Sequence, residues 1–440
     1  MTADRLAERL GRLRVQVKDL GSRPVRGLVL RATGSLVRAV LPGTRMGELC
    51  WLRDRGLREP LLAEVVGLDG DETILAPVGE MLGLSAGAEV ERTGDVLRVP
   101  VGNALLGRVL DGLGRPLDGA GLDSCPLKAV HAVPPPALQR RLVNKVLPVG
   151  VRAIDGLMTC GEGQRVGIYG EPGAGKSTLL GSLVRGAQVD VVVVALVGER
   201  GREVRDFLER QLDPQTRART VLVVATSDRT AAERLKAGYT ATTIAEDFRD
   251  NGLRVLLVVD SLTRFARALR EIGLAAGEPP ARRGFPPSVM AELPRLLERA
   301  GSSASGSITA FYTVLVEGDG TGDPIAEETR SILDGHIVLS PGLASSGHFP
   351  AIDVLASRSR VMEAVTDPLH NTCASRVREL LQLYSEVEFL VQVGEYKSGA
   401  NPRSDAALAS IDPIRAFLRQ DSTEVTSLQE TQSWLTRLTN

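Results

Sequence analysis

Residues 170–178 read Gly-Glu-Pro-Gly-Ala-Gly-Lys-Ser-Thr, and this stretch decides the fold of the chain. It matches G-x-x-x-x-G-K-[ST], in which glycines let backbone N–H groups turn toward phosphate oxygens. In this pattern Lys176 reaches the terminal phosphates, and the hydroxyl of Ser177 holds Mg²⁺. We therefore predict a strand, a phosphate loop and a helix whose positive end faces a nucleoside triphosphate. The predicted phosphate-binding residues are Gly170, Glu171, Pro172, Gly173, Ala174, Gly175, Lys176, Ser177 and Thr178.

Around this loop, short apolar runs alternate with longer amphipathic ones. Strands are predicted at 165–169, 191–197, 221–225, 254–259, 307–314 and 336–339, and helices at 178–186, 203–211, 231–250, 261–271, 289–300 and 324–333. Regular alternation of this kind predicts an α/β fold with a mostly parallel sheet. Ligands of such sheets bind at the carboxyl ends of the strands, where the phosphate loop lies.

Two carboxylates follow predicted strands at that edge. Asp260 ends the apolar run 255–259 and is expected to hold Mg²⁺ or its water shell. Glu199 follows the strand at 191–197 and can orient an attacking water. The plainer alternatives are a strand that simply ends in Asp and a solvated, charged turn. Later, Arg358 and Arg360 are either phosphate-facing arginines or members of surface salt bridges.

Composition narrows the class of protein. The net charge is −1 and aromatic residues make up 3% of the chain, which argues against a nucleic-acid-binding surface. The four cysteines are scattered, so neither disulfides nor a zinc site is expected. No apolar run approaches the roughly 18 residues that cross a bilayer, and the N-terminus lacks the apolar core of a signal peptide. We therefore expect a cytoplasmic protein.

Changes in pattern along the chain predict its domains. We place an amphipathic segment at 1–23, a small β-barrel at 24–100, a linker and the start of the core at 101–148, a P-loop ATPase domain at 149–365 and a C-terminal helical domain at 366–440. The barrel is predicted from closely spaced short strands with glycine or charged turns. In the first segment Leu6, Leu10 and Leu13 share one helical face, which fits either an ordinary docking helix or contact with a membrane surface.

Several longer stretches carry a resemblance to a known family. They are residues 150–156, 161–165, 198–204, 278–288, 307–319 and 334–340. Through them, nearly the whole chain resembles the catalytic subunits of rotary ATP synthases and, within that family, the flagellar and type III secretion ATPases. The resemblance implies a RecA-like core and ATP hydrolysis with Mg²⁺.

The resemblance also implies roles for individual residues. Glu199 matches the family's catalytic carboxylate, and Arg200 matches its phosphate-facing neighbour. Arg360 falls where the family places an arginine finger that reaches the neighbouring subunit's site. Phe349 and Tyr396 match two aromatic residues that pack against adenine, although ordinary core packing is the alternative for both.

An arginine finger that acts on a neighbour implies a homohexameric ring. The resemblance further implies a central stalk, stator proteins and chaperone–effector complexes as partners, and a place at the cytoplasmic face of the inner membrane. The loops at 278–288 and 317–324 match loops that face the stalk. Residues 155–156, 160–165 and 354–357 favour a secretion ATPase, which would release chaperones and unfold cargo, over a flagellar export ATPase. A ring-shaped nucleic-acid helicase is the more distant alternative.

Overall fold

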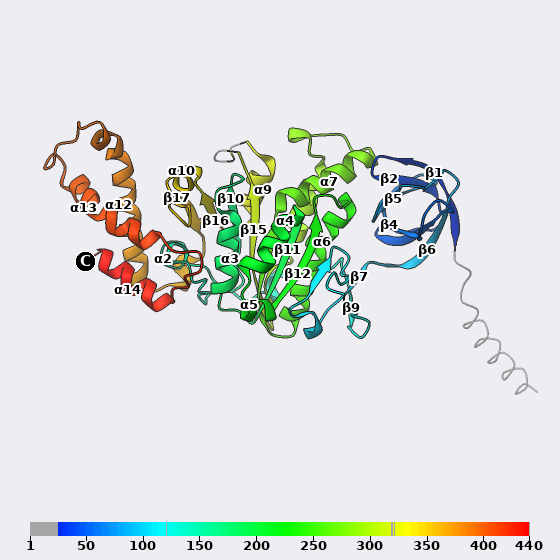
Figure 1. Ribbon diagram of the computed structural model, residues 1–440, viewed down its shortest axis with the longest axis horizontal. Helices are drawn as coiled ribbons and strands as arrows, with labels where there is room; N and C mark the ends of the chain where they lie inside the picture. The colour runs from blue at the N-terminus through cyan, green and yellow to red at the C-terminus, as the bar shows by residue number, and fades with distance from the viewer. Residues whose placement is uncertain (1–24, 120, 318–319, 321, 440) are drawn as a thin grey trace, which may run out of the picture. The chain divides into compact units, whose positions relative to one another are not determined.

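The computed structural model describes residues 25–439, except residues 120, 318–319 and 321. The chain divides into two compact units, one ending at Leu97 and the other beginning at Arg98 (Figure 1). The amphipathic segment predicted at 1–23 lies outside the described residues. Among those described, no helix combines the length and the apolar character needed to cross a bilayer.

The first unit is a closed β-barrel with the strand order β1-β2-β5-β4-β3-β6. Its strands are β1 (Arg26–Thr33), β2 (Leu36–Val40), β3 (Glu48–Arg53), β4 (Leu61–Asp69), β5 (Glu72–Pro77) and β6 (Glu89–Val96). Inward-facing residues of successive strands, such as Val37, Leu52 and Leu75, are fully buried and form the barrel's own core. The β-barrel predicted from the sequence is therefore confirmed.

A mostly parallel sheet forms the centre of the second unit, in the order β17-β16-β10-β15-β13-β11-β12-β8. The strands are β8 (Val109–Asp111), β10 (Arg165–Gly170), β11 (Val191–Glu199), β12 (Thr220–Thr226), β13 (Arg254–Asp260), β15 (Ser307–Leu315), β16 (Gly335–Leu339) and β17 (Ile352–Ser359), with β14 (Gly301–Ser302) paired to β15. β11 is buried along its whole length, as expected of a strand covered on both faces. β7 (Arg98–Pro100) and β9 (Leu127–Ala129), which lie before and after β8 in the chain, form a separate two-stranded pair.

Helices cover both faces of the sheet. α3 (Lys176–Gly186) packs on the face formed by Val192, Val194 and Leu196 of β11. α6 (Ala231–Asp250) and α7 (Leu262–Ala276) lie against the other face. The shorter helices are α2 (Arg152–Leu157), α4 (Gly201–Asp206), α5 (Pro214–Ala218), α8 (Pro287–Leu297), α9 (Pro324–Ile332), α10 (Pro341–Ser345) and α11 (Met362–Val365). The predicted helix at 203–211 is split, because α4 passes into a π-helical turn at Phe207–Gln211.

Three C-terminal helices gather beside α2 (Figure 1). They are α12 (Pro368–Gln392), α13 (Pro402–Leu418) and α14 (Leu428–Thr439). α12 begins at a Pro after Asp367, whose carboxylate accepts the N–H of His370, so its N-terminus is well capped. Val377, Phe417 and Leu435 join the same apolar cluster as α3. The α/β core with a C-terminal helical region is thus confirmed.

The strand β17 was not predicted. It runs antiparallel to β16, with Leu339 opposite Ile352 and Gly335 opposite Ser359. Its burial pattern is irregular and it contains an arginine, so its sequence lacks the apolar alternation that marks a strand. Because β17 reverses direction, it carries the chain from the carboxyl edge of the parallel strands back to their amino edge.

Candidate active site

The phosphate loop connects β10 to α3 at the carboxyl edge of the sheet. Gly173 and Gly175 have φ angles of 90° and 84°, in the left-handed region that favours glycine. Gly170 has a different role, since a Cβ there would lie 2.9 Å from the Cβ of Leu339. Nothing lies within 4 Å of the Cβ position of Gly173, so the cradle is open on that side. The loop and the first turn of α3 together fit an anion.

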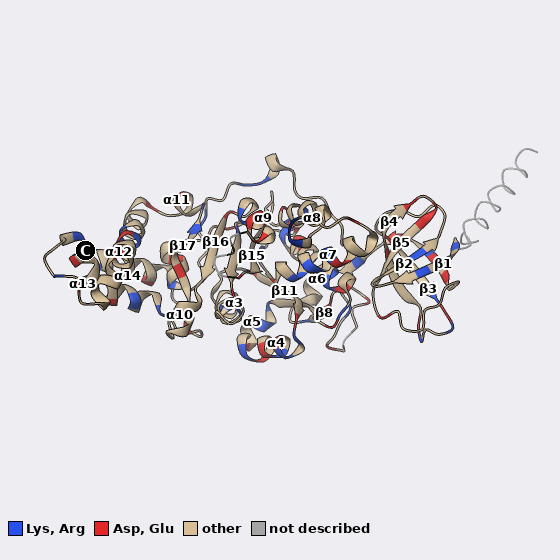
Figure 2. Cartoon of the chain, turned by 90° about the horizontal axis from the view of Figure 1, so that it is seen from above, with Lys and Arg blue, Asp and Glu red and all other residues tan. Residues whose placement is uncertain are grey.

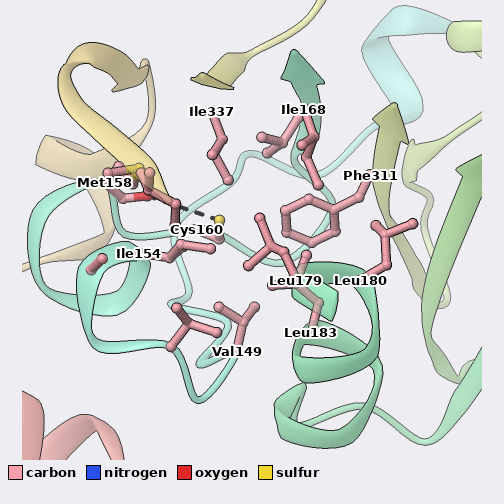
Figure 3. Close-up of a cluster of buried hydrophobic side chains, with 14 of the residues drawn as sticks. Val149, Ile154, Met158, Cys160, Ile168, Leu179, Leu180, Leu183, Phe311 and Ile337 are labelled. Atoms are coloured by element: carbon pink, nitrogen blue, oxygen red, sulfur yellow. Dashed lines mark hydrogen bonds between the residues drawn. The ribbon is translucent and has the colours of Figure 1, made fainter. Parts of the chain in front are cut away.

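Apolar packing fixes the position of this helix. Leu179, Leu180 and Leu183 of α3 point toward Phe311 of β15 and Ile168 of β10 (Figure 3). All five side chains are 3% exposed or less. The start of α3, with Lys176 and Ser177, is therefore held rigidly at the edge of the sheet.

Lys176 lies among the predicted carboxylates. Its Nζ is 2.6 Å from Oδ1 of Asp260 at the end of β13, and 3.9 Å from Oε1 of Glu199 at the end of β11. Thr313 of β15 donates a hydrogen bond of 2.7 Å to the same Asp260 oxygen. The structure thus brings Lys176, Asp260 and Glu199 together from three separate parts of the chain.

Glu199 is 5% exposed and incompletely partnered. Its Oε2 lies 3.4 Å from Nη2 of Arg264, whose other nitrogen donates to the carbonyl of Gly198. Its Oε1 is buried without a hydrogen-bond partner in the described structure. Burial first, then a hydrogen bond with Glu203 and the charge of Asp260, raise the pKa of Glu199 to about 8. The same hydrogen bond lowers the pKa of Glu203.

The cleft beside these groups fits Mg²⁺ only together with a nucleotide. Ser177 is exposed and lines a cavity of about 200 Å³ with Glu199 and Asp260. In the described part of the chain, no three His, Cys, Asp or Glu side chains are grouped so that they could hold a metal ion. A hydroxyl and a carboxylate supply two oxygen ligands, and Mg²⁺ commonly completes its shell with phosphate oxygens and water. The residues present fit that arrangement.

A second pocket lies on the other side of the phosphate loop. It is lined by Gly175, Phe349 and the segment 420–422, and the Cβ position of Gly175 is 3.3 Å from the ring of Phe349. Phe349 is 43% exposed, so its ring is not ordinary core. Sequence reasoning missed the segment 420–422, which follows α13 and carries no motif.

Tyr396 is not part of this pocket. It lies in the turn between α12 and α13, where its hydroxyl is 3.0 Å from Oδ1 of Asp405 and 3.3 Å from the carbonyl oxygen of Asn401. The structure therefore places Phe349 beside the phosphate loop and gives Tyr396 a local partner instead. The wall opposite Phe349 comes from the segment 420–422.

A buried arginine on α2 holds that segment in place. Nε of Arg152 donates to the carbonyl of Phe417, its guanidinium also binds Glu424, and it lies 4.8 Å from the centre of the Trp434 ring. The backbone N–H of Arg152 donates to the side chain of Gln420, and the N–H of Gln420 donates to the carbonyl of Phe349. The pocket wall is thus tied to the nucleotide-binding core and to α14.

The two predicted catalytic arginines lie outside the cluster of Lys176, Asp260 and Glu199. Arg200 is exposed at the start of α4, directly after Glu199. Arg360 follows β17 and is exposed at the opposite edge of the sheet, where its N–H donates to the carbonyl of Asp334 and its Nη2 to that of Arg330. The structure does not bring Arg360 to the Lys176 of its own chain.

The two predicted stalk-facing loops contact each other. Nη1 of Arg283 in the first loop lies 4.0 Å from Oδ2 of Asp323 in the second. Nη2 of Arg282 lies 2.7 Å from Oε2 of Glu327 on α9, which follows the second loop. Residues 318, 319 and 321 of the second loop lie outside the described residues. Elsewhere, basic and acidic residues are interspersed along the described elements of both units (Figure 2), in keeping with 53 basic and 54 acidic residues.

Comparison with known proteins agrees with this geometry. Three family models match the chain: "ATP synthase alpha/beta family, beta-barrel domain" at residues 29–94, "ATP synthase alpha/beta family, nucleotide-binding domain" at 150–359, and "T3SS EscN ATPase C-terminal domain" at 366–437. A "Type 3 secretion system ATPase" of Sinorhizobium fredii is 58% identical, covering 96% of this chain and 94% of the relative. A "Flagellum-specific ATP synthase" of Bacillus subtilis is 47% identical, covering 94% of this chain and 95% of the relative.

Solved structures are similar over the same extent. The assembled ATPase EscN of the enteropathogenic Escherichia coli type III secretion system matches with a TM-score of 0.90 and 47% identity, covering 94% of this chain and 100% of that one. EscN in complex with its central stalk EscO matches with a TM-score of 0.86 and 46% identity, with the same coverage.

The fold and the site therefore define a P-loop ATPase of the ATP synthase alpha/beta family. Secretion relatives are more similar to the chain than the flagellar one, and the C-terminal match is to a secretion ATPase domain. The chain belongs to the type III secretion system ATPases. The predicted family, its ATPase activity and the preference for the secretion branch are confirmed.

Proposed function

We propose that copies of this chain form a homohexameric ring in which each ATP site is completed by the next copy. The opposite placement of two groups carries this proposal. Lys176 lies at the carboxyl edge of the sheet, whereas Arg360 follows Ser359, which pairs with Gly335 at the amino edge. Leu339 at the carboxyl edge is four positions after Gly335, so the two edges lie about 13 Å apart along this strand. Arg360 is therefore suited to a neighbour's site, and repeating that contact closes a ring.

Within one site, the roles follow from position. The loop at 170–178 cradles the phosphates, Lys176 contacts the terminal phosphates, and Ser177 with Asp260 holds Mg²⁺. The metal, when bound, neutralises charge on the phosphate oxygens. Glu199, with one oxygen that accepts no hydrogen bond, orients and polarises the attacking water.

The remaining roles belong to arginines and an aromatic ring. Arg200, directly after Glu199, faces the phosphates. Arg360 of the neighbouring copy stabilises charge that develops in the transition state, an effect worth several orders of magnitude in rate. Phe349 packs against the adenine in the pocket beside Gly175.

A mixing experiment tests the shared site. An Arg360→Ala chain and a Lys176→Ala chain are each expected to be inactive alone. In mixed rings, some interfaces combine an intact phosphate loop with an intact arginine, so activity should partly return. No recovery in rings whose mixed composition is verified by native mass spectrometry would overturn the proposal.

In the cell, we propose that ATP hydrolysis releases chaperones from exported proteins and unfolds the cargo at the cytoplasmic face of the inner membrane. Family membership supports this role, and so does the solved complex of EscN with its central stalk EscO. The stalk would meet the loop at 278–288, while stator proteins and chaperone–effector complexes would be further partners. Secretion of a reporter substrate by a deletion strain should return with the intact chain and not with Lys176→Ala.

Flagellar export is the second candidate, because flagellum-specific relatives match at 47% identity over almost the whole chain. Complementation of two deletion strains separates the candidates. We expect the chain to restore secretion through an injectisome but not motility. Restored motility without secretion would favour the flagellar role.

A further inference from the structure

Three large apolar side chains are exposed on one short segment before the nucleotide-binding core. Val133, Leu138 and Leu142 are 89%, 101% and 86% exposed. Single exposed apolar residues are common and need no explanation. Three on one short segment, all almost fully open to solvent, do need one.

Two arginines fix this segment to the body of the unit. Nη1 of Arg140 donates to the carbonyl of Ala300 at 3.1 Å, and Nε of Arg141 donates to that of Ser303 at 2.9 Å. Nη2 of Arg141 also donates to the carbonyl of Gly306 at 3.0 Å. The exposed side chains are therefore presented on an anchored backbone, which lowers the entropic cost of binding a partner.

A chain of ionic contacts joins the segment to the arginine finger. Nη2 of Arg140 lies 3.2 Å from Glu298, whose other oxygen lies 2.5 Å from Arg165. Arg165 pairs with Asp334 at 3.0 Å, and the carbonyl of Asp334 accepts the N–H of Arg360. The segment and Arg360 are thus linked through one network of contacts at the amino edge of the sheet.

We propose that Val133, Leu138 and Leu142 dock against a second copy of this chain, across the same interface that Arg360 crosses. The inference rests on the proposed shared site. A stable interface buries roughly 800 Å² on each partner, far more than one arginine can cover. It combines an apolar centre with a polar rim. Val133, Leu138 and Leu142 are exposed on an anchored backbone that these contacts link to Arg360, so they supply the apolar part.

The first test removes the apolar groups and leaves the ATP site intact. The double variant Leu138→Ser/Leu142→Ser should need at least about tenfold more protein to reach half-maximal specific ATPase activity, because two buried leucines are lost from the interface. Activity per chain should return to the original level at saturating protein. Leu369→Ser, on α12 and 63% exposed, is the matched control and should behave like the unchanged chain.

The second test does not depend on how the double variant folds. A photo-reactive benzoylphenylalanine in place of Leu138 should give a covalent dimer of this chain, with the linked peptide in the nucleotide-binding domain of the second copy. Normal assembly of the double variant together with no such dimer would overturn the inference.

The Arg360→Ala and Lys176→Ala mixture distinguishes failure of the docking surface from failure of the shared site. If the mixture recovers activity while the docking tests are negative, the shared site stands and only the docking surface is wrong. If the mixture fails and the unchanged chain is a monomer with concentration-independent turnover, the shared site and the docking surface are both overturned.

Discussion

The two edges of the central sheet differ in how complete they are. At the carboxyl edge, Lys176, Asp260 and Glu199 are partly or fully buried, and both carboxylates lie within 4 Å of the Lys176 ammonium. At the amino edge, Arg360 and the leucines at 138 and 142 are exposed. The groups at the carboxyl edge contact one another within the chain. Arg360 and the two leucines at the amino edge do not reach the phosphate loop of their own chain. The difference supports our proposal that a single copy holds most of one active site and one essential part of another.

The largest expected loss of activity comes from a substitution at the amino edge of the sheet. Arg360→Ala should lower kcat by about 10³-fold or more, the range in which arginine fingers act. Arg358→Ala, on the same strand and also exposed, is the matched control and should lose much less. Steady-state ATPase assays at saturating protein measure both. A larger loss in Arg358→Ala than in Arg360→Ala would mean that the finger has been assigned to the wrong arginine.

At the buried edge, Glu199→Gln should lower kcat by about 10²- to 10³-fold and leave ATP binding nearly unchanged. The amide retains the shape of the side chain but cannot accept a proton. A fluorescent nucleotide measures binding, and phosphate release measures turnover. An unchanged kcat would remove Glu199 from the mechanism.

The raised pKa of Glu199 predicts that ATPase activity depends on pH. Because the pKa of Glu199 is raised to about 8, it is mostly neutral at pH 7 and must lose its proton to act as a base. The value of kcat/KM should rise about tenfold per pH unit below pH 8 and level off above it. Glu203→Gln removes a group that raises this pKa, so the rise should move to lower pH. A profile that is flat from pH 6 to 9 would contradict the prediction.

The smallest effect concerns the pocket beside Gly175. Phe349→Ala should raise KM for ATP by about tenfold with little change in kcat, because stacking on a base is worth about 1–3 kcal/mol. Tyr396→Ala is the control and should leave KM unchanged, since the Tyr396 hydroxyl bonds to Asp405 and its side chain does not line the pocket. A raised KM in Tyr396→Ala with none in Phe349→Ala would reverse the assignment.

The cluster at the carboxyl edge was largely predictable from the sequence, and the pocket beside it was not. Lys176, Asp260 and Glu199 each follow a recognisable strand, and the carboxyl ends of parallel strands meet at one edge. The pocket wall at 420–422 depends on how α13 packs and on the buried Arg152, neither of which leaves a local pattern. Tyr396 was expected near adenine from a short match, but its position depends on the turn between α12 and α13. The direction of β17 could not be predicted, because pairing with β16 and not apolar alternation defines that strand.

β17 has one more consequence. It begins three residues after Phe349, which lines the pocket beside Gly175, and ends one residue before Arg360, which we propose reaches the next site. Its eight residues span about 26 Å. In a ring, a single strand would therefore act as a mechanical link between consecutive sites. The order in which the sites hydrolyse ATP can then be set within the sheet of each subunit, without a contribution from the central stalk.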